Sequence, residues 1–353
     1  MARLRGLYIL EEPSMPMIYG PDERRDIARY VDFIAPPQTR ESISLHPELL
    51  ANVDVIFSGW GAPRMDDAFL QSAPNLKAVF YGAGATGYCV TESLWKRNIL
   101  VTSAYEANAI PVAEYTLSVI LFSLKHGWSL ARRTRQTRTF LDRNGAPGCY
   151  GSSVGLLSLG VTARALVKLL KAFDLRLFAT DPYVTRGEAH ELGIELVSLG
   201  DLFRKCDVVS VHTPVLAETI GMITGAHIAS MKQGAVFINT ARGEIVREDE
   251  MIQVLSGRTD LQAILDVAVK EPPEEDSPLY TLPNVILTPH IAGSVGQECR
   301  RMGRFMVDEL RRYLAGLPLQ GLVTRQLAER SSHRPVKVTV HAKQSMRPPI
   351  VAR

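Results

Sequence analysis

Three residues with chemically useful side chains, Arg242, Glu271 and His290, each follow a short apolar run in the second half of the chain. Such runs predict parallel strands, whose carboxyl ends meet at one edge of a sheet. A guanidinium, a carboxylate and an imidazole would therefore share that edge. An imidazole can exchange a proton near neutral pH, and a guanidinium can hold a carboxylate. Taken singly, the histidine could be a hydrogen-bonding residue only, and Arg242 could form a structural ion pair with Glu271.

The stretch 154–181 must position those side chains relative to a ligand. It has the pattern of a strand, a tight turn, a helix and a second strand that ends in Asp181. Ser158, Gly160 and Ala163 occupy the three positions of the dinucleotide-binding pattern G-x-G-x-x-G/A. Asp181 stands where the carboxylate for the ribose hydroxyls is expected. Ser158 departs from the pattern, and a side chain is tolerated there if the backbone angle is ordinary. A βαβ unit without a ligand is the alternative.

The remaining chain alternates strand and helix patterns, which predicts an α/β fold. A length of 353 residues suggests two domains. Apolar runs at 7–10, 53–57, 76–80 and 99–101 outline the first, with glycine-rich turns at 58–61 and 81–85. We expect a long buried helix from Asn108, with Pro111 in its first turn, and a final helix at about 298–314 that returns to the first domain.

The net charge of +3 is concentrated at one end of the chain. From Arg325 onward there are seven cations and one anion, so the rest of the chain is mildly acidic. We predict that residues 325–353 form a basic, disordered tail, and we disfavour nucleic-acid binding by it. Four scattered cysteines, the absence of a signal-peptide pattern and the absence of a long apolar run predict a cytoplasmic protein without a metal site or a membrane span.

Five segments carry a resemblance to a known family. They are NAIPVAEYT (108–116), HTPVLAETIGMI (212–223), MKQGAVFINTARGEIV (231–246), ILDVAVKEPP (264–273) and LTPHIAGS (287–294). Over roughly residues 50–320 the chain resembles the D-isomer-specific 2-hydroxyacid dehydrogenases. The resemblance implies two Rossmann- or flavodoxin-like, doubly wound parallel-sheet domains with the active site in the cleft between them. It implies a discontinuous substrate domain, residues 1–105 plus 295–324, and an NAD-binding Rossmann domain, residues 106–294.

The resemblance also implies a site. His290 would be the acid/base, Glu271 its support, and Arg242 the group that binds the substrate carboxylate and carbonyl. The backbone of Ala83 and Gly84 would bind the substrate carboxylate, although the loop 84–87 lacks the acid common in the family. The expected cofactor-binding residues are Ser158, Leu159, Gly160, Val161, Thr162, Asp181, His212, Thr213, Pro214, Thr240, Ala241, Arg242, Asp266 and His290.

The function that we predict is that of an NAD-dependent oxidoreductase acting on a small D-2-hydroxy or 2-keto acid, as a homodimer. Asp181 favours NAD over NADP because its carboxylate would repel a 2′-phosphate, and the nearby Arg186 tempers that preference. The alternative is an NAD(H)-responsive binding protein with little turnover, as the family's transcriptional co-repressors are. The sequence leaves open which acid is the substrate.

Overall fold

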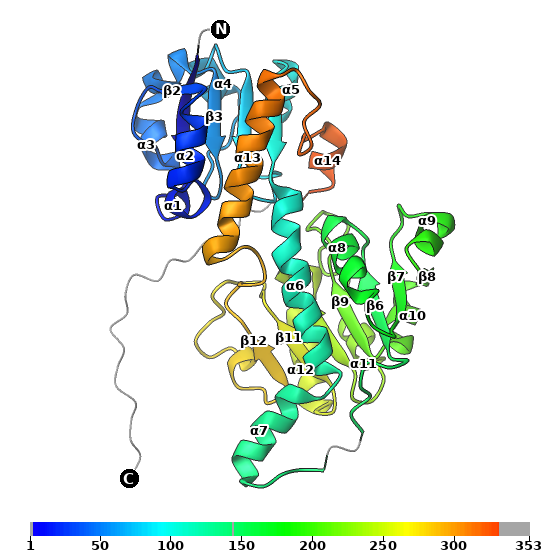
Figure 1. Cartoon of the computed structure of the whole chain (residues 1–353). Helices are drawn as coiled ribbons and strands as arrows, with labels where there is room; N and C mark the ends of the chain where they lie inside the picture. Colours follow the sequence, from blue (N-terminus) through cyan, green and yellow to red (C-terminus); the bar gives the residue numbers. More distant parts are fainter. Residues whose placement is uncertain (1–2, 143–144, 332–353) are drawn as a thin grey trace, which may run out of the picture.

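The computed structural model describes residues 3–142 and 145–331, which form two lobes joined by a long helix (Figure 1). Each lobe is built on a parallel sheet, because short, fully buried apolar runs alternate with helices along the chain. The sheet of the first lobe has the order β2-β1-β3-β4-β5. Its strands are β1 (Leu4–Ile9), β2 (Val31–Phe33), β3 (Val55–Ser58), β4 (Ala78–Tyr81) and β5 (Leu100–Ser103).

The second lobe contains a seven-stranded sheet in the order β12-β11-β10-β9-β6-β7-β8. The strand order reverses direction at β6, so the carboxyl ends of β6 and β9 flank the crevice where such sheets bind nucleotides. The strands are β6 (Ser153–Leu157), β7 (Arg176–Thr180), β8 (Ile194–Leu196), β9 (Val208–Val211), β10 (Val236–Asn239), β11 (Gln262–Leu265) and β12 (Val285–Leu287). The predicted class of two doubly wound α/β domains is confirmed.

Helices cover both sheets. The first lobe contains α1 (Ser14–Ile18), α2 (Pro21–Ile27), α3 (Arg40–Leu45), η1 (Pro47–Asn52), α4 (Asp67–Ser72) and α5 (Glu92–Lys96). The second lobe contains α8 (Val161–Leu170), α9 (Arg186–Glu191), α10 (Leu199–Lys205), α11 (Gly225–Ala229), η2 (Gly243–Ile245), α12 (Glu248–Gly257), η3 (Pro278–Tyr280) and η4 (Gly296–Glu298).

Helix α6 (Tyr105–Ser123) links the lobes and packs against α8. It begins three residues earlier than predicted, so Pro111 lies inside the helix and not in its first turn. Helix α7 (Gly127–Thr137) follows; none of its residues is fully buried, although Trp128 packs partly buried against the core and contacts the ring of Phe122. In the described part of the chain no single helix could span a membrane by length and composition, and α6 with α7 would pass that test only as a pair bent by 54°.

Helix α13 (Cys299–Leu314) is the predicted final helix, and it returns to the first lobe, where it packs against α1 and α2. The chain then continues along the free edge of β5. Leu322 forms an antiparallel bridge with Thr102, and the N–H of Val323 donates to the carbonyl of Val101 at 2.8 Å. The buried carboxylate of Glu309 accepts the N–H groups of Gln320 and Gly321 and so anchors this segment.

The short helix α14 (Arg325–Glu329) follows the bridge, and the side chain of Ala328 is buried against the first lobe. The expectation of a disordered tail beginning at residue 325 is therefore wrong for residues 325–331. A composition-based prediction missed this helix because Thr324 caps it and one small apolar residue is enough to dock it. The rest of the predicted tail, residues 332–353, lies outside the described residues.

Candidate active site

His290 and Glu271 meet at the carboxyl edge of the second sheet. The Nδ1 atom of His290 lies 2.8 Å from Oε2 of Glu271, and both side chains are about three-quarters buried. Burial raises the pKa of Glu271, but its hydrogen bond to His290 and the charge of that ring outweigh burial, so the pKa is lowered overall. The predicted pairing of imidazole and carboxylate is present, and Nε2 is the ring nitrogen that this pairing leaves for another partner.

Asp266 holds the loop that carries His290 through hydrogen bonds. The carboxylate of Asp266 is 2% exposed and accepts hydrogen bonds from the hydroxyl of Thr288 and the N–H groups of Ile291 and Ala292. The N–H of His290 donates to the carbonyl of Asp266 at 2.9 Å, and His290 itself has a φ of +54°, a conformation rare for a side-chain-bearing residue. Asp266 is one of the expected cofactor-binding residues, and within the described chain its carboxylate holds the His290 loop.

Arg242 stands on a tight turn after β10. Asn239 builds this turn: its side-chain amide donates to the carbonyl of Arg242, and its oxygen accepts the N–H of Ala241. Burial lowers the pKa of Arg242 and the charge of Glu271 opposes this, but a guanidinium remains charged at neutral pH. Among the described residues no carboxylate lies within ion-pair distance of Arg242, so the alternative of a structural ion pair with Glu271 is not observed.

Gly243 connects the Arg242 turn to the Glu271 loop. A Cβ atom at this position would lie 2.0 Å from the carbonyl carbon of Ala268, well inside van der Waals contact. The N–H of Ala268 in turn donates to Oε1 of Glu271 at 3.3 Å. These two loops can therefore approach each other closely only because residue 243 is a glycine.

The turn between β6 and α8 offers donors for an anion. Gly160 caps α8 without a side-chain hydrogen bond, and a Cβ on Gly160 would meet no atom within 4 Å. Among the described residues the N–H groups of Gly160, Val161 and Thr162 have no hydrogen-bond partner. Free N–H groups at a helix N-terminus are the donor set that a pyrophosphate requires, so the residues present fit a dinucleotide.

Ser158 has a φ of +74°, so the condition under which a side chain is easily tolerated there is not met. This is the left-handed region, in which a residue with a Cβ is strained by about 1–2 kcal/mol. The hydroxyl of Ser158 forms a hydrogen bond of 2.8 Å with the hydroxyl of Thr213, which compensates in part. The first position of the dinucleotide-binding pattern thus has the left-handed backbone typical of glycine, although the residue is a serine.

Asp181 lies at the end of β7, as predicted. One oxygen accepts the N–H of Leu159 at 2.7 Å, and the other accepts the N–H of Tyr183 at 2.8 Å. A carboxylate has about four lone-pair positions, so both oxygens can still accept ribose hydroxyls. The carboxylate therefore joins the fingerprint turn to the loop after β7.

His212 directly follows β9, beside the same turn. Its Nε2 atom lies 3.0 Å from the hydroxyl of Ser210, and burial lowers its pKa to about 4. The ring is therefore neutral at physiological pH. Nearby, the hydroxyls of Thr116 and Thr240 lie 3.2 Å apart, which ties α6 to the loop after β10.

One cleft between the lobes collects most of the predicted cofactor residues. Those lining it are Ser158, Leu159, Gly160, Val161, Thr162, Asp181, His212, Thr213, Pro214, Thr240, Ala241 and Arg242. Gly84 lines it from the first lobe, while Ala83 is fully buried beneath. No described residue accepts the N–H group of either Ala83 or Gly84. His290, Glu271 and Asp266 do not line this cleft.

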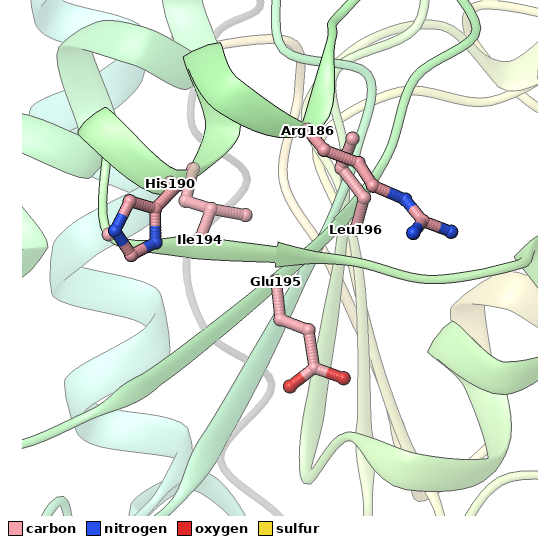
Figure 2. A pocket seen from close by; sticks show the side chains of 6 residues that line it. Arg186, His190, Ile194, Glu195 and Leu196 are labelled. Atoms are coloured by element: carbon pink, nitrogen blue, oxygen red, sulfur yellow. The ribbon is translucent and has the colours of Figure 1, made fainter.

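Arg186, which we expect to temper the preference for NAD, does not line the cleft. It lines a second hollow, over α9 and β8, which is separate from the cleft. Figure 2 shows Arg186 and His190 on the helix side of this hollow, while Glu195 points away on the other side of β8.

Sequence reasoning missed several residues of the cleft. Asn108 accepts the N–H of Ser294 at 3.2 Å and lines the cleft; it lies in a quoted motif, but no role was assigned to it. Tyr183 follows Asp181 by two residues, so its place could have been inferred. Leu327 and Arg330 line the cleft from the C-terminal segment, where no motif indicated a site.

The chain is similar in sequence to several known proteins. Residues 117–292 match the family described as D-isomer specific 2-hydroxyacid dehydrogenase, NAD binding domain. The chain is 33% identical to the candidate 2-hydroxyacid dehydrogenase YoaD of Bacillus subtilis, covering 65% of this chain and 68% of that one. It is 30% identical to the D-3-phosphoglycerate dehydrogenase of Archaeoglobus fulgidus, covering 74% of this chain and 49% of the relative. The chain spans about half the length of the phosphoglycerate dehydrogenases that it matches.

Solved structures share the fold. The holo form of Rhodotorula graminis D-mandelate dehydrogenase superposes with a TM-score of 0.77 at 22% identity, covering 92% of this chain and 99% of that one. A phosphoglycerate oxidoreductase of Rhizobium etli superposes with a TM-score of 0.76 at 24% identity, with the same coverage.

Proposed function

The chain belongs to the D-isomer specific 2-hydroxyacid dehydrogenase family, and on that premise we propose that it transfers a hydride between NAD(H) and a small D-2-hydroxy or 2-keto acid. The observation that carries the proposal is the hydrogen bond between His290 and Glu271 at the sheet edge that also presents Arg242. A bound nicotinamide ring would supply the hydride chemistry.

His290 moves the proton in this proposal. With Nδ1 engaged by Glu271, Nε2 donates a proton to the substrate's carbonyl oxygen during reduction and takes the hydroxyl proton in the reverse direction. Glu271 fixes the ring orientation and stabilises the imidazolium. Its lowered pKa keeps it ionised for that task.

Arg242 and the loop after β4 hold the substrate. The guanidinium presents a planar fork of donors to the carboxylate and the carbonyl oxygen, and the N–H groups of Ala83 and Gly84, which no described residue accepts, donate to the second carboxylate oxygen. The hydroxyl of Ser103 lies 2.9 and 2.8 Å from the carbonyl oxygens of Ala83 and Gly84 and donates its one hydrogen to this pair, which holds the loop against β5.

Turnover tests this proposal. The purified protein is mixed with NADH or NADPH and a panel of 2-keto acids that includes glyoxylate, hydroxypyruvate, pyruvate and a bulky aromatic acid, and oxidation of the cofactor is followed at 340 nm. We expect turnover with at least one acid and a preference for NADH. A protein that binds NADH but turns over no acid would instead support the alternative of an NAD(H)-responsive binding protein.

We also propose that two copies associate through α6 and α7 and that the protein acts in the cytoplasm. No residue of α7 is fully buried within one copy, and Phe122 on α6 is 43% exposed. One copy has a mass of 39.0 kDa, so light scattering that gives about twice this value would support the dimer.

A further inference from the structure

The C-terminal segment brings a cation to the cofactor cleft. Arg330 follows α14 directly, and its guanidinium carbon lies 4.2 Å from the centre of the Tyr183 ring. Tyr183 belongs to the second lobe and Arg330 to a segment docked on the first, so the contact crosses the mouth of the cleft. In Figure 1 α14 lies above α8 and α9, across the gap between the lobes.

The position of α14 is fixed by the first lobe. Val323 pairs with β5, and its carbonyl accepts the indole N–H of Trp95. Arg325 forms an ion pair of 2.5 Å with Glu92, on the side of α14 that does not line the cleft. Arg330 is therefore presented by an anchored element, and its place in the cleft does not depend on its contact with Tyr183 alone.

The charge of Arg330 has no partner of opposite sign within residues 3–142 and 145–331. Among the described residues no carboxylate lies within ion-pair distance of it, and the oxygens of Asp181 accept backbone N–H groups. A guanidinium that stacks on an aromatic face keeps its N–H donors free in the plane of the stack. These charged N–H donors bind an anionic phosphate oxygen more strongly than a neutral acceptor.

We propose that Arg330 is a cofactor-binding residue that donates to a phosphate group of the bound dinucleotide from the opposite lobe. The proposal rests on the proposed function. Tyr183 follows Asp181, the ribose carboxylate, by two residues, so the stacked guanidinium stands at the adenosine end of the cleft, beside the turn of Gly160. The phosphate is either the pyrophosphate, which both dinucleotides carry, or the 2′-phosphate of NADPH.

Direct titration of NADH and NADPH by fluorescence tests this inference without turnover. The full chain is compared with Arg330→Ala, Arg330→Lys and the control Arg325→Ala, which makes the same change on the other side of α14. We expect Arg330→Ala to raise Kd about tenfold, which is the loss of one charged hydrogen bond. Arg330→Lys should be intermediate, because it keeps the charge and loses the planar fork. Arg325→Ala should leave Kd unchanged, because the pairing of Val323 with β5 and the burial of Ala328 still dock α14.

The outcomes separate the possible causes. A loss for both dinucleotides assigns the contact to the pyrophosphate, and a loss for NADPH alone assigns it to the 2′-phosphate. Unchanged affinity in Arg330→Ala overturns the inference, as does an equal loss in Arg325→Ala, which would mean that only the docking of α14 matters. If the unaltered protein binds neither dinucleotide, the proposed function itself fails.

Discussion

Glu271 accepts a hydrogen bond at Oε2 from Nδ1 of His290 over 2.8 Å, and this contact joins the loops that follow β11 and β12. The two loops leave neighbouring parallel strands at the same edge, so the sheet brings them together. The contact fixes which nitrogen of the ring is free.

Replacing His290 by Ala should lower kcat by about 10²–10⁴-fold, because the group that exchanges the substrate proton is lost. Dinucleotide affinity should persist, since His290 does not line the cleft of Gly160 and Asp181. Stopped-flow assays and NADH titration would measure the two effects separately. His190→Ala, an exposed histidine on α9, is the matched control and should behave as the unaltered protein. Full turnover in His290→Ala would refute the acid/base role.

Because the backbone at Ser158 is left-handed, we predict that Ser158→Gly is more stable than Ser158→Ala, which is the reverse of the usual order. Both Ser158→Gly and Ser158→Ala lose the hydrogen bond to Thr213, but only glycine relieves the left-handed conformation. We expect the glycine variant to be more stable by about 1 kcal/mol. At an ordinary backbone position alanine would be the more stable of the two. Urea unfolding of both variants gives the difference, and a more stable alanine variant would contradict the assigned backbone angle.

Gly243→Ala should damage both stability and activity, because the new methyl group would overlap the backbone of Ala268. Relief requires a shift of the loop that carries Glu271, so kcat should fall together with the melting temperature. Gly257→Ala is the control, since a Cβ there meets no atom within 4 Å. Differential scanning fluorimetry and initial rates on both variants would check this. Equal behaviour of the two would show that the loops are not in tight contact.

His212 should make the protein less stable in mild acid. Burial lowers its pKa to about 4, whereas an unfolded histidine titrates near 6.5. The unfolded chain therefore binds the extra proton first, and stability that is complete above about pH 6.5 is lost progressively as the pH falls toward 4. His212→Gln keeps a polar partner for Ser210 but has no such titration. The urea midpoint of the unaltered protein should fall more than that of the variant between pH 7.5 and 5, and parallel curves would exclude this role for His212.

Sequence patterns placed much of the site because its residues follow strands. The meeting of Glu271 and His290 and the collection of the Gly160 turn, Asp181 and Arg242 in one cleft follow from parallel strands that end at one edge. Other features depend on distant parts of the chain. The strain at Ser158 comes from its backbone angle, which the residue type does not indicate. The three hydrogen bonds that Asp266 accepts come from residues more than 20 positions further along the chain.

The C-terminal segment was the least predictable part. Residues 325–331 have a polar composition typical of disorder, and the pairing of Leu322 with Thr102 joins positions far apart in the sequence. Only the folded sheet provides the edge on which this segment docks, and with it the place of Arg330.

The bridge of residues 321–323 on β5 has a consequence for the behaviour of shortened versions of this chain. An uncovered strand at the margin of a sheet is a template for pairing with another chain. The first sheet otherwise has one open margin, at β2, and removal of the segment from Gly321 onward would create a second at β5. Truncations that remove the basic end should therefore keep the chain up to residue 331. Versions that also lose residues 321–323 would expose β5 and should aggregate through it.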